Sequence, residues 1–200
     1  SLSALIILLY SLFFAPPPSK IDAQKNNITK KEKQLNETSP TIENKSESKK
    51  ISRIEALKVN NRIKVENENI LGSISLKGAV IDDLTFKKYN TNIESSENVV
   101  LLNPNNSANG YFIESGWAST DKNIELPNSS TEWKVVGNSK LTPNNPVKLE
   151  WINKQGIIFT NLFEIDNKYL FKLSQKIENK TDKIFDFYPY TQIVRNIKPD

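Results

Sequence analysis

The sequence predicts an all-β domain behind an N-terminal hydrophobic segment and a polar spacer. Fifteen of the eighteen aromatic residues lie between Phe86 and Tyr190. Short runs with period-two alternation recur there, with proline, glycine or asparagine between them. No window after residue 51 shows a sustained helical period. Many short strands at this spacing are typical of a sandwich or a barrel.

The first fifteen residues are expected to be a transmembrane helix truncated at its N-terminus. Leu2–Ala15 carries no charge, and as a helix it would span about 21 Å of a hydrocarbon core of about 30 Å. The missing initiator methionine indicates truncation or processing. A signal peptidase needs small residues at −3 and −1, and Phe13 would occupy −3 if Ala15 were at −1. A signal peptide and a buried helix are the alternatives.

Residues 16–50 are expected to be a disordered linker. Three prolines at 16–18 end the helix, and the stretch then holds eight lysines, five acidic residues and no aromatic residue. Such a composition buries too little apolar surface to offset its ordering entropy. It also supplies +3 of the net charge of +4, so the rest of the chain lacks the basic patch of a nucleic-acid-binding protein. The lysines alone do not settle the orientation of the helix, since long domains translocate largely regardless of charge.

The folded domain is expected over residues 51–200, and to be incomplete at its C-terminus. Arg62–Glu66 places Ile63 and Val65 on one face, and turn residues follow it. The prolines of this region fall in the gaps between strands, where proline is tolerated. The expected strands before residue 156 are Arg62–Glu66, Ile70–Leu76, Ala79–Tyr89, Val99–Leu102, Tyr111–Trp117, Glu132–Val136 and Val147–Ile152.

The clearest local signal is a hairpin. Ile157–Ile165 and Tyr169–Ile177 each present one mostly apolar face at period two. Between them, Asp166–Lys168 supplies residues that tolerate a positive φ. We therefore predict an antiparallel hairpin whose inward-facing core residues are Phe159, Phe163, Phe171 and Leu173.

The composition excludes several kinds of chemistry. Without cysteine there is no disulfide, no thiolate metal site and no cysteine nucleophile. Without histidine the chain lacks the usual general base, the usual metal ligand and any Ser-His-Asp triad. No glycine spacing forms a phosphate-binding loop. We expect no catalytic, cofactor-binding or metal-binding residues, no cofactor and no enzyme activity.

Two pairs of carboxylates are candidates for a functional site, and each also has a purely structural explanation. Glu164 and Asp166 are two residues apart and could point from one strand face, as an acid–base pair or as calcium ligands. The ordinary reading is a solvated strand end that runs into a turn. Asp82 and Asp83 are adjacent, so we expect their side chains to face opposite ways.

An aromatic group could form a sugar-stacking platform, although aromatic residues in a sandwich more often fill the core. Pro189, inside a strand-like run, indicates an edge strand or a bulge. The residues of this candidate platform are Trp117, Trp133, Trp151 and the triplet Tyr188-Pro189-Tyr190.

Four stretches together resemble a known family. They are Leu76–Tyr89 (LKGAVIDDLTFKKY), Val99–Pro104 (VVLLNP), Tyr111–Ser119 (YFIESGWAS) and Leu141–Arg195, which runs from Leu-Thr-Pro through Tyr-Pro-Tyr. Their order and spacing are similar to the first periplasmic domain of YidC-type membrane protein insertases in the alphaproteobacterial form. One hydrophobic segment, a variable spacer and then this domain also resembles the family's N-terminal layout. Ala79 and Asn161 depart from an expected glycine and arginine.

The resemblance implies a β-supersandwich of the galactose-mutarotase type in the periplasm. It implies a protein that inserts and helps fold integral inner-membrane proteins, alone or with the Sec translocon, and requires no cofactor. This chain would supply the anchor and a docking domain, with residues 16–200 in the periplasm and the full-length protein crossing the inner membrane several times. Its partners would be the lipid bilayer, nascent membrane proteins and the Sec translocon with its accessory subunits.

Two other functions remain open at this stage. One is a membrane-tethered or secreted periplasmic carbohydrate-binding module, which would need exposed tryptophans. The other is a mutarotase-like enzyme, although mutarotases use histidine and this chain has none, so sugar chemistry does not transfer from the fold alone.

Overall fold

A computed structural model describes residues 50–197. The expected transmembrane helix over residues 1–15, and all but the last residue of the expected linker over residues 16–50, lie outside the described residues. Across residues 50–197, no helix has the length and apolar character that a membrane crossing requires.

The described chain holds one helical turn and eleven strands. Each strand expected from the sequence is present, with its ends shifted by no more than two residues. The elements are α3 (Arg53–Ala56), β1 (Arg62–Glu66), β2 (Ile70–Ser75), β3 (Val80–Asn90), β4 (Asn98–Leu102), β5 (Tyr111–Ala118), β6 (Lys134–Val136), β7 (Lys140–Leu141), β8 (Val147–Ile152), β9 (Ile157–Ile165), β10 (Phe171–Asn179) and β11 (Tyr188–Arg195).

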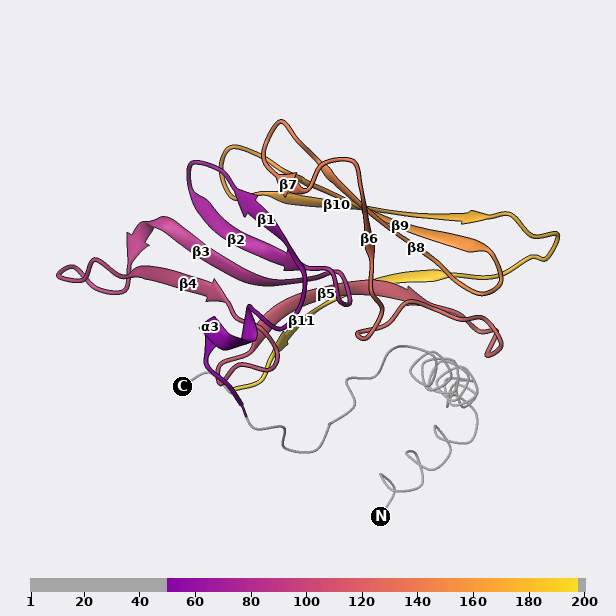
Figure 1. The fold of residues 1–200 in the computed structure, drawn as a ribbon, viewed down its shortest axis with the longest axis horizontal. Helices are drawn as coiled ribbons and strands as arrows, with labels where there is room; N and C mark the ends of the chain where they lie inside the picture. Colours follow the sequence, from indigo (N-terminus) through magenta and orange to yellow (C-terminus); the bar gives the residue numbers. More distant parts are fainter. Residues whose placement is uncertain (1–49, 198–200) are drawn as a thin grey trace, which may run out of the picture. The chain divides into compact units, whose positions relative to one another are not determined.

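The strands form two sheets, which are seen one above the other in Figure 1. The larger sheet has the order β11-β5-β3-β2-β1-β7, with β4 also paired to β3, and the smaller has the order β10-β9-β8-β6. One hydrophobic core joins them, with side chains such as Ile63 and Trp117 from the larger sheet and Leu149 and Phe163 from the smaller. The prediction of an all-β sandwich is therefore confirmed.

The β9–β10 hairpin is confirmed, but its two strands are buried to different degrees. Phe171 pairs with Ile165 in antiparallel register. In β9, Phe159 and Phe163 are fully buried; in β10, Phe171 and Leu173 pack against the core but are only half-buried. The prediction that all four side chains face the core is confirmed. Phe171 and Leu173 are nevertheless only partly buried, because β10 is the outermost strand of its sheet within residues 50–197.

Two elements were not predicted, and a third was indicated only around its proline. β7 is only two residues long, and α3 is a single turn, too short to show a helical period. β11 extends the strand-like run around Pro189 to Tyr188–Arg195. α3 forms because Ser52 and Glu55 make a capping box: the Ser52 hydroxyl accepts from the Glu55 N–H and the Glu55 carboxylate accepts from the Ser52 N–H at 3.0 Å.

The turn between β2 and β3 explains one unusual residue. Gly78 and Ala79, in the four-residue connection between Ser75 and Val80, both have positive φ, 77° and 54°. Ala79 is the position at which the resemblance led us to expect a second glycine. A positive φ costs alanine roughly 1 kcal/mol relative to glycine.

Candidate functional site

The tryptophans of the candidate aromatic platform fill the core. Trp117 and Trp133 are buried and stack with their ring centroids 6.2 Å apart. Phe159 lies 5.1 Å from the Trp117 ring centroid and 5.6 Å from that of Trp151. Because Trp117 and Trp133 present no ring face to solvent, these residues form no sugar-stacking surface.

Glu164 and Asp166 do not form an acid–base pair. Glu164 lies in β9 and its carboxylate pairs with Lys172 of β10 at 2.8 Å. Asp166 begins the β9–β10 turn, where its Oδ1 accepts hydrogen bonds from the N–H groups of Lys168 and Leu170 at 2.8 and 2.9 Å. The ordinary reading, a strand end that runs into a turn, is the correct one.

The side chains of Asp82 and Asp83 lie on the same face of the sheet, although adjacent residues of a regular strand were expected to face opposite ways. The register between β2 and β3 shifts at Ser73/Ile74, so that Ser73 pairs with Asp83 and Ile74 with Ile81. Asp82 is the extra residue of this β-bulge. A bulge interrupts the alternation of side chains, and both carboxylates therefore turn to the face of the sheet opposite the core. Adjacency in the sequence gives no sign of the bulge.

Two arginines neutralise these carboxylates. Arg53 of α3 forms an ion pair with Asp83, and Arg62 of β1 forms one with Asp82. Ser73 links the pairs, because its hydroxyl accepts from Arg62 Nε at 2.7 Å and donates to Asp83 at 2.5 Å. Burial raises the pKa of Asp82, and Arg62 opposes that shift. Two cations and two anions leave no net charge, so the cluster is a structural network.

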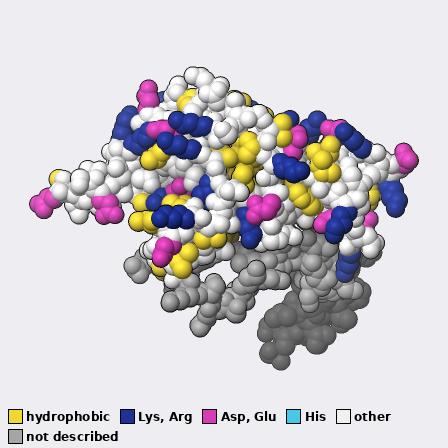
Figure 2. All heavy atoms as spheres, viewed as in Figure 1, with side chains coloured by type: hydrophobic (Ala, Val, Ile, Leu, Met, Phe, Trp, Pro, Cys, Tyr) yellow, Lys and Arg dark blue, Asp and Glu magenta, His cyan; other side chains and the backbone are white. Residues whose placement is uncertain are grey.

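A second charged cluster surrounds Glu66 on the same face. Its carboxylate lies 3.0 Å from the ammonium groups of Lys64 and Lys87 and 2.9 Å from that of Lys140. Hydrogen bonds from these three lysines, that of Lys140 first, lower the pKa of Glu66 to about 2. The cluster joins β1, β3 and β7. Figure 2 shows that acidic and basic side chains are interspersed on the face it displays, with no field of a single sign.

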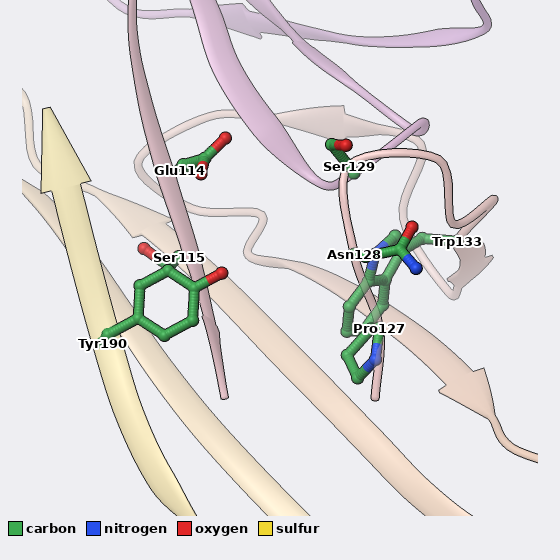
Figure 3. Close-up of a pocket in the computed structure, with 8 residues that line it drawn as sticks. Glu114, Ser115, Pro127, Asn128, Ser129, Trp133 and Tyr190 are labelled. Carbon is green, nitrogen blue, oxygen red and sulfur yellow. The ribbon is translucent and has the colours of Figure 1, made fainter. Parts of the chain in front are cut away.

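One small pocket lies between β5, β11 and the segment before β6 (Figure 3). Tyr190 extends from β11 toward Pro127 and Asn128, with Glu114 and Ser115 on the β5 side. Burial and the charge of Glu114 raise the pKa of Tyr190. The space holds about one water molecule. A sugar or a cofactor does not fit.

Metal binding has no candidate residues in the described part of the chain. Across residues 50–197, no three side chains of the types His, Cys, Asp and Glu are grouped as a metal site requires. The remaining candidates for function are therefore surfaces rather than pockets.

The two longest sheet edges are β10 and β11. Each is the outermost strand of its sheet within residues 50–197, so its outward N–H and C=O groups are available to a further strand. β10 carries Lys172, Lys176 and Glu178 on its exposed side, and charges of this kind deter pairing.

β11 is much less protected. It has no charge from Tyr188 to Val194, and its Pro189 removes a single donor near the start of the strand. Of the two expectations for Pro189, an edge strand or a bulge, the edge strand is confirmed within residues 50–197. Tyr188 and Ile193 add exposed apolar surface. The unprotected edge of β11 is the best candidate for a docking surface.

Comparison with known proteins identifies relatives over the whole chain. The family model of the YidC periplasmic domain matches residues 62–200. The membrane protein insertase YidC of Pelagibacter ubique is 51% identical over 201 residues, which cover 100% of this chain and 36% of that protein. The proteins of the same name from Beijerinckia indica and Rickettsia akari are 34% and 42% identical, over 99% and 67% of this chain and 35% and 24% of their own lengths. The chain thus spans about a quarter to a third of the length of these relatives.

Proposed function

The chain belongs to the YidC family, and from this premise we propose that it is the anchoring and periplasmic docking part of a membrane protein insertase. The full-length protein would insert and help fold integral membrane proteins in the bacterial inner membrane, alone or together with the Sec translocon. Residues 16–200 would lie in the periplasm.

The division of labour follows from what insertion requires. A client segment needs a polar path into the bilayer, and polar groups inside a membrane are costly and so are confined to functional positions. Residues 50–197 instead form two sheets around an apolar core. The insertion path would therefore belong to the larger part of the full-length protein, beyond the stretch that this chain covers.

The observation that carries the docking role is the unprotected edge of β11. An extended segment from a second polypeptide would gain main-chain hydrogen bonds there by β-augmentation. Tyr188 and Ile193 would add apolar contact. The partners proposed for this edge are accessory subunits of the Sec translocon. A strand from later in the same full-length polypeptide is the competing occupant.

Site-specific cross-linking in membranes tests the docking role. A photoreactive residue replaces Ile193 of β11, which is 65% exposed, in the full-length protein. Ile152 of β8, which is 59% exposed, is the matched control. We expect an intermolecular adduct with a translocon subunit from position 193 and a weaker one or none from position 152.

Two results would count against the docking role. Equal adducts from both positions would show that the edge is not selective. An adduct confined to the same polypeptide would assign the edge to the rest of the insertase. The carbohydrate-binding alternative is not favoured, since Trp117 and Trp133 are buried and the pocket beside Tyr190 holds about a single water molecule.

A further inference from the structure

We propose that residues 50–58 form a releasable clamp that sets how far the domain can reach from its attachment point. We call this segment the N-terminal clamp. It lies immediately before the residues that match the family model, which begin at 62. The clamp itself follows from contacts within the domain, and its effect on reach rests on the proposed membrane anchor.

The first two residues of the clamp, Lys50 and Ile51, are bound to the loop between β4 and β5. Ile51 forms a parallel bridge with Ser107, and its N–H donates to the carbonyl of Asn106 at 3.2 Å. Lys50 Nζ donates to the carbonyl of Ala108 at 3.4 Å. Residues 50 and 51 therefore lie beside the loop between β4 and β5.

The helical turn of the clamp depends on its cap. α3 is four residues long, and a helix of that length does not persist alone in water. The Ser52–Glu55 capping box supplies partners for donors at its first turn, and hydrogen bonds from Ser52 lower the pKa of Glu55. Both capping residues are exposed, and the hydrogen bonds of their side chains run between the two of them, so we expect the sheets to stay intact when they are changed.

The clamp is held on the sheet mainly by polar contacts. Arg53 pairs with Asp83 and also donates to the Thr85 hydroxyl at 3.4 Å. Ala56 is the one fully buried apolar side chain of α3, while Ile54 and Val59 are 67% and 59% exposed. Elements with little buried apolar surface open at a lower free energy than the global unfolding. The clamp can therefore release while the sandwich stays folded.

The rest of the charged network does not need the clamp. When Arg53 leaves, Asp83 keeps its hydrogen bond from Ser73 at 2.5 Å, and Ser73 keeps its bond from Arg62. The Arg62–Asp82 pair joins β1 to β3. Arg53 is thus the ionic contact of the clamp, and Arg62 belongs to the sheet.

Release would lengthen the tether considerably. In the closed state the domain is attached from Ile51 onward. In the open state it is attached from Asn61, whose carbonyl accepts a hydrogen bond from the Leu76 N–H at 2.9 Å. The ten residues from 51 to 60 would add about 33–36 Å when fully extended. With the clamp closed or open, the domain could therefore reach partners at two different distances from the membrane, while the sandwich itself stays unchanged.

Limited proteolysis of the complete 200-residue chain tests the clamp. The double variant Ser52→Ala/Glu55→Ala removes the capping box and keeps the trypsin sites after Arg53 and Lys58. We expect cleavage at these sites to accelerate about five-fold, the factor that corresponds to the loss of a typical N-cap. The urea midpoint, followed by tryptophan fluorescence, should stay unchanged. Glu94→Ala, an exposed acid in the β3–β4 loop, is the matched control.

Hydrogen exchange of the Arg53→Gln variant is an independent test of the ionic contact. The amides of Ala56 and Leu57 should lose protection while those of Ile63 and Val65 keep it. Two results overturn the clamp: unchanged cleavage and exchange in both variants, or a fall in the urea midpoint that accompanies the faster cleavage, since the segment would then unfold only with the whole domain.

The effect on reach has its own measurement. A dye on Ser96→Cys, a unique thiol because the chain has no cysteine, transfers energy to acceptor lipids in vesicles that carry the chain. The capping-box variant should show lower transfer than the parent. Unchanged transfer together with faster cleavage would refute the proposed anchoring geometry and leave the clamp itself standing.

Discussion

Phe159→Ala should be among the most destabilising single changes in the domain. Phe159 is fully buried on β9, and its ring centroid lies 5.1, 5.6 and 5.7 Å from those of Trp117, Trp151 and Phe187. A buried Phe→Ala change costs about 3–5 kcal/mol. For a domain of this size the corresponding fall in Tm is about 6–20 °C.

Two neighbours on β10 provide matched comparisons. Phe171 is half-buried at the sheet edge, so Phe171→Ala should cost only about 1–1.5 kcal/mol. Lys172→Ala removes an exposed pair with Glu164 and should cost no more than about 0.5 kcal/mol. Urea unfolding followed by tryptophan fluorescence measures all three variants, since Trp117 and Trp151 flank Phe159. Equal losses at Phe159 and Phe171 would refute the assignment of β10 as an edge strand.

Three further changes test the polar interior and the charged clusters. Asn161→Leu should stabilise the domain by about 1–3 kcal/mol in urea unfolding, because the fully buried Asn161 amide has no hydrogen-bond partner among residues 50–197; a loss of stability would show that the amide is satisfied in solution. Arg62→Gln should cost about 3–5 kcal/mol, since it leaves Asp82 buried without its partner, whereas the double change Arg62→Met/Asp82→Leu should cost clearly less, and equal costs would count against that reasoning. The pKa of Glu66 is lowered from 4.5 to about 2, so its stabilising effect is present above pH 4.5 and is lost as the pH falls toward 2; Glu66→Gln should flatten the Tm profile in that window, and an unchanged acid slope would contradict the three-lysine arrangement.

Local alternation predicted most of the sheet structure correctly. The period-two pattern of Ile157–Ile165 places Phe159 and Phe163 on the inner face, and both are buried. The same pattern in β10 identifies the inner face. It does not show how many strands pair with β10, so it could not show that Phe171 lies on an edge strand. The tryptophans could have formed a sugar-binding platform or part of the core. Their burial in the structure decides for the core, and the sequence alone does not reveal that burial.

The charged network could not be predicted, because it depends on long-range register. Asp83 meets Arg53 from 30 residues away and Asp82 meets Arg62 from 20 residues away. The two carboxylates share one face only because of the bulge opposite Ser73/Ile74. Adjacent aspartates on a regular strand would face opposite ways, and nothing in their local sequence indicates otherwise.

The central claim is that this chain anchors and docks but does not itself insert clients. Complementation of cells depleted of their insertase tests it most directly, with membrane insertion of a client protein as the measurement. The 200-residue chain alone should restore no insertion, while a full-length protein that lacks residues 60–200 should retain much of it. Restored insertion by the 200-residue chain alone would contradict the account.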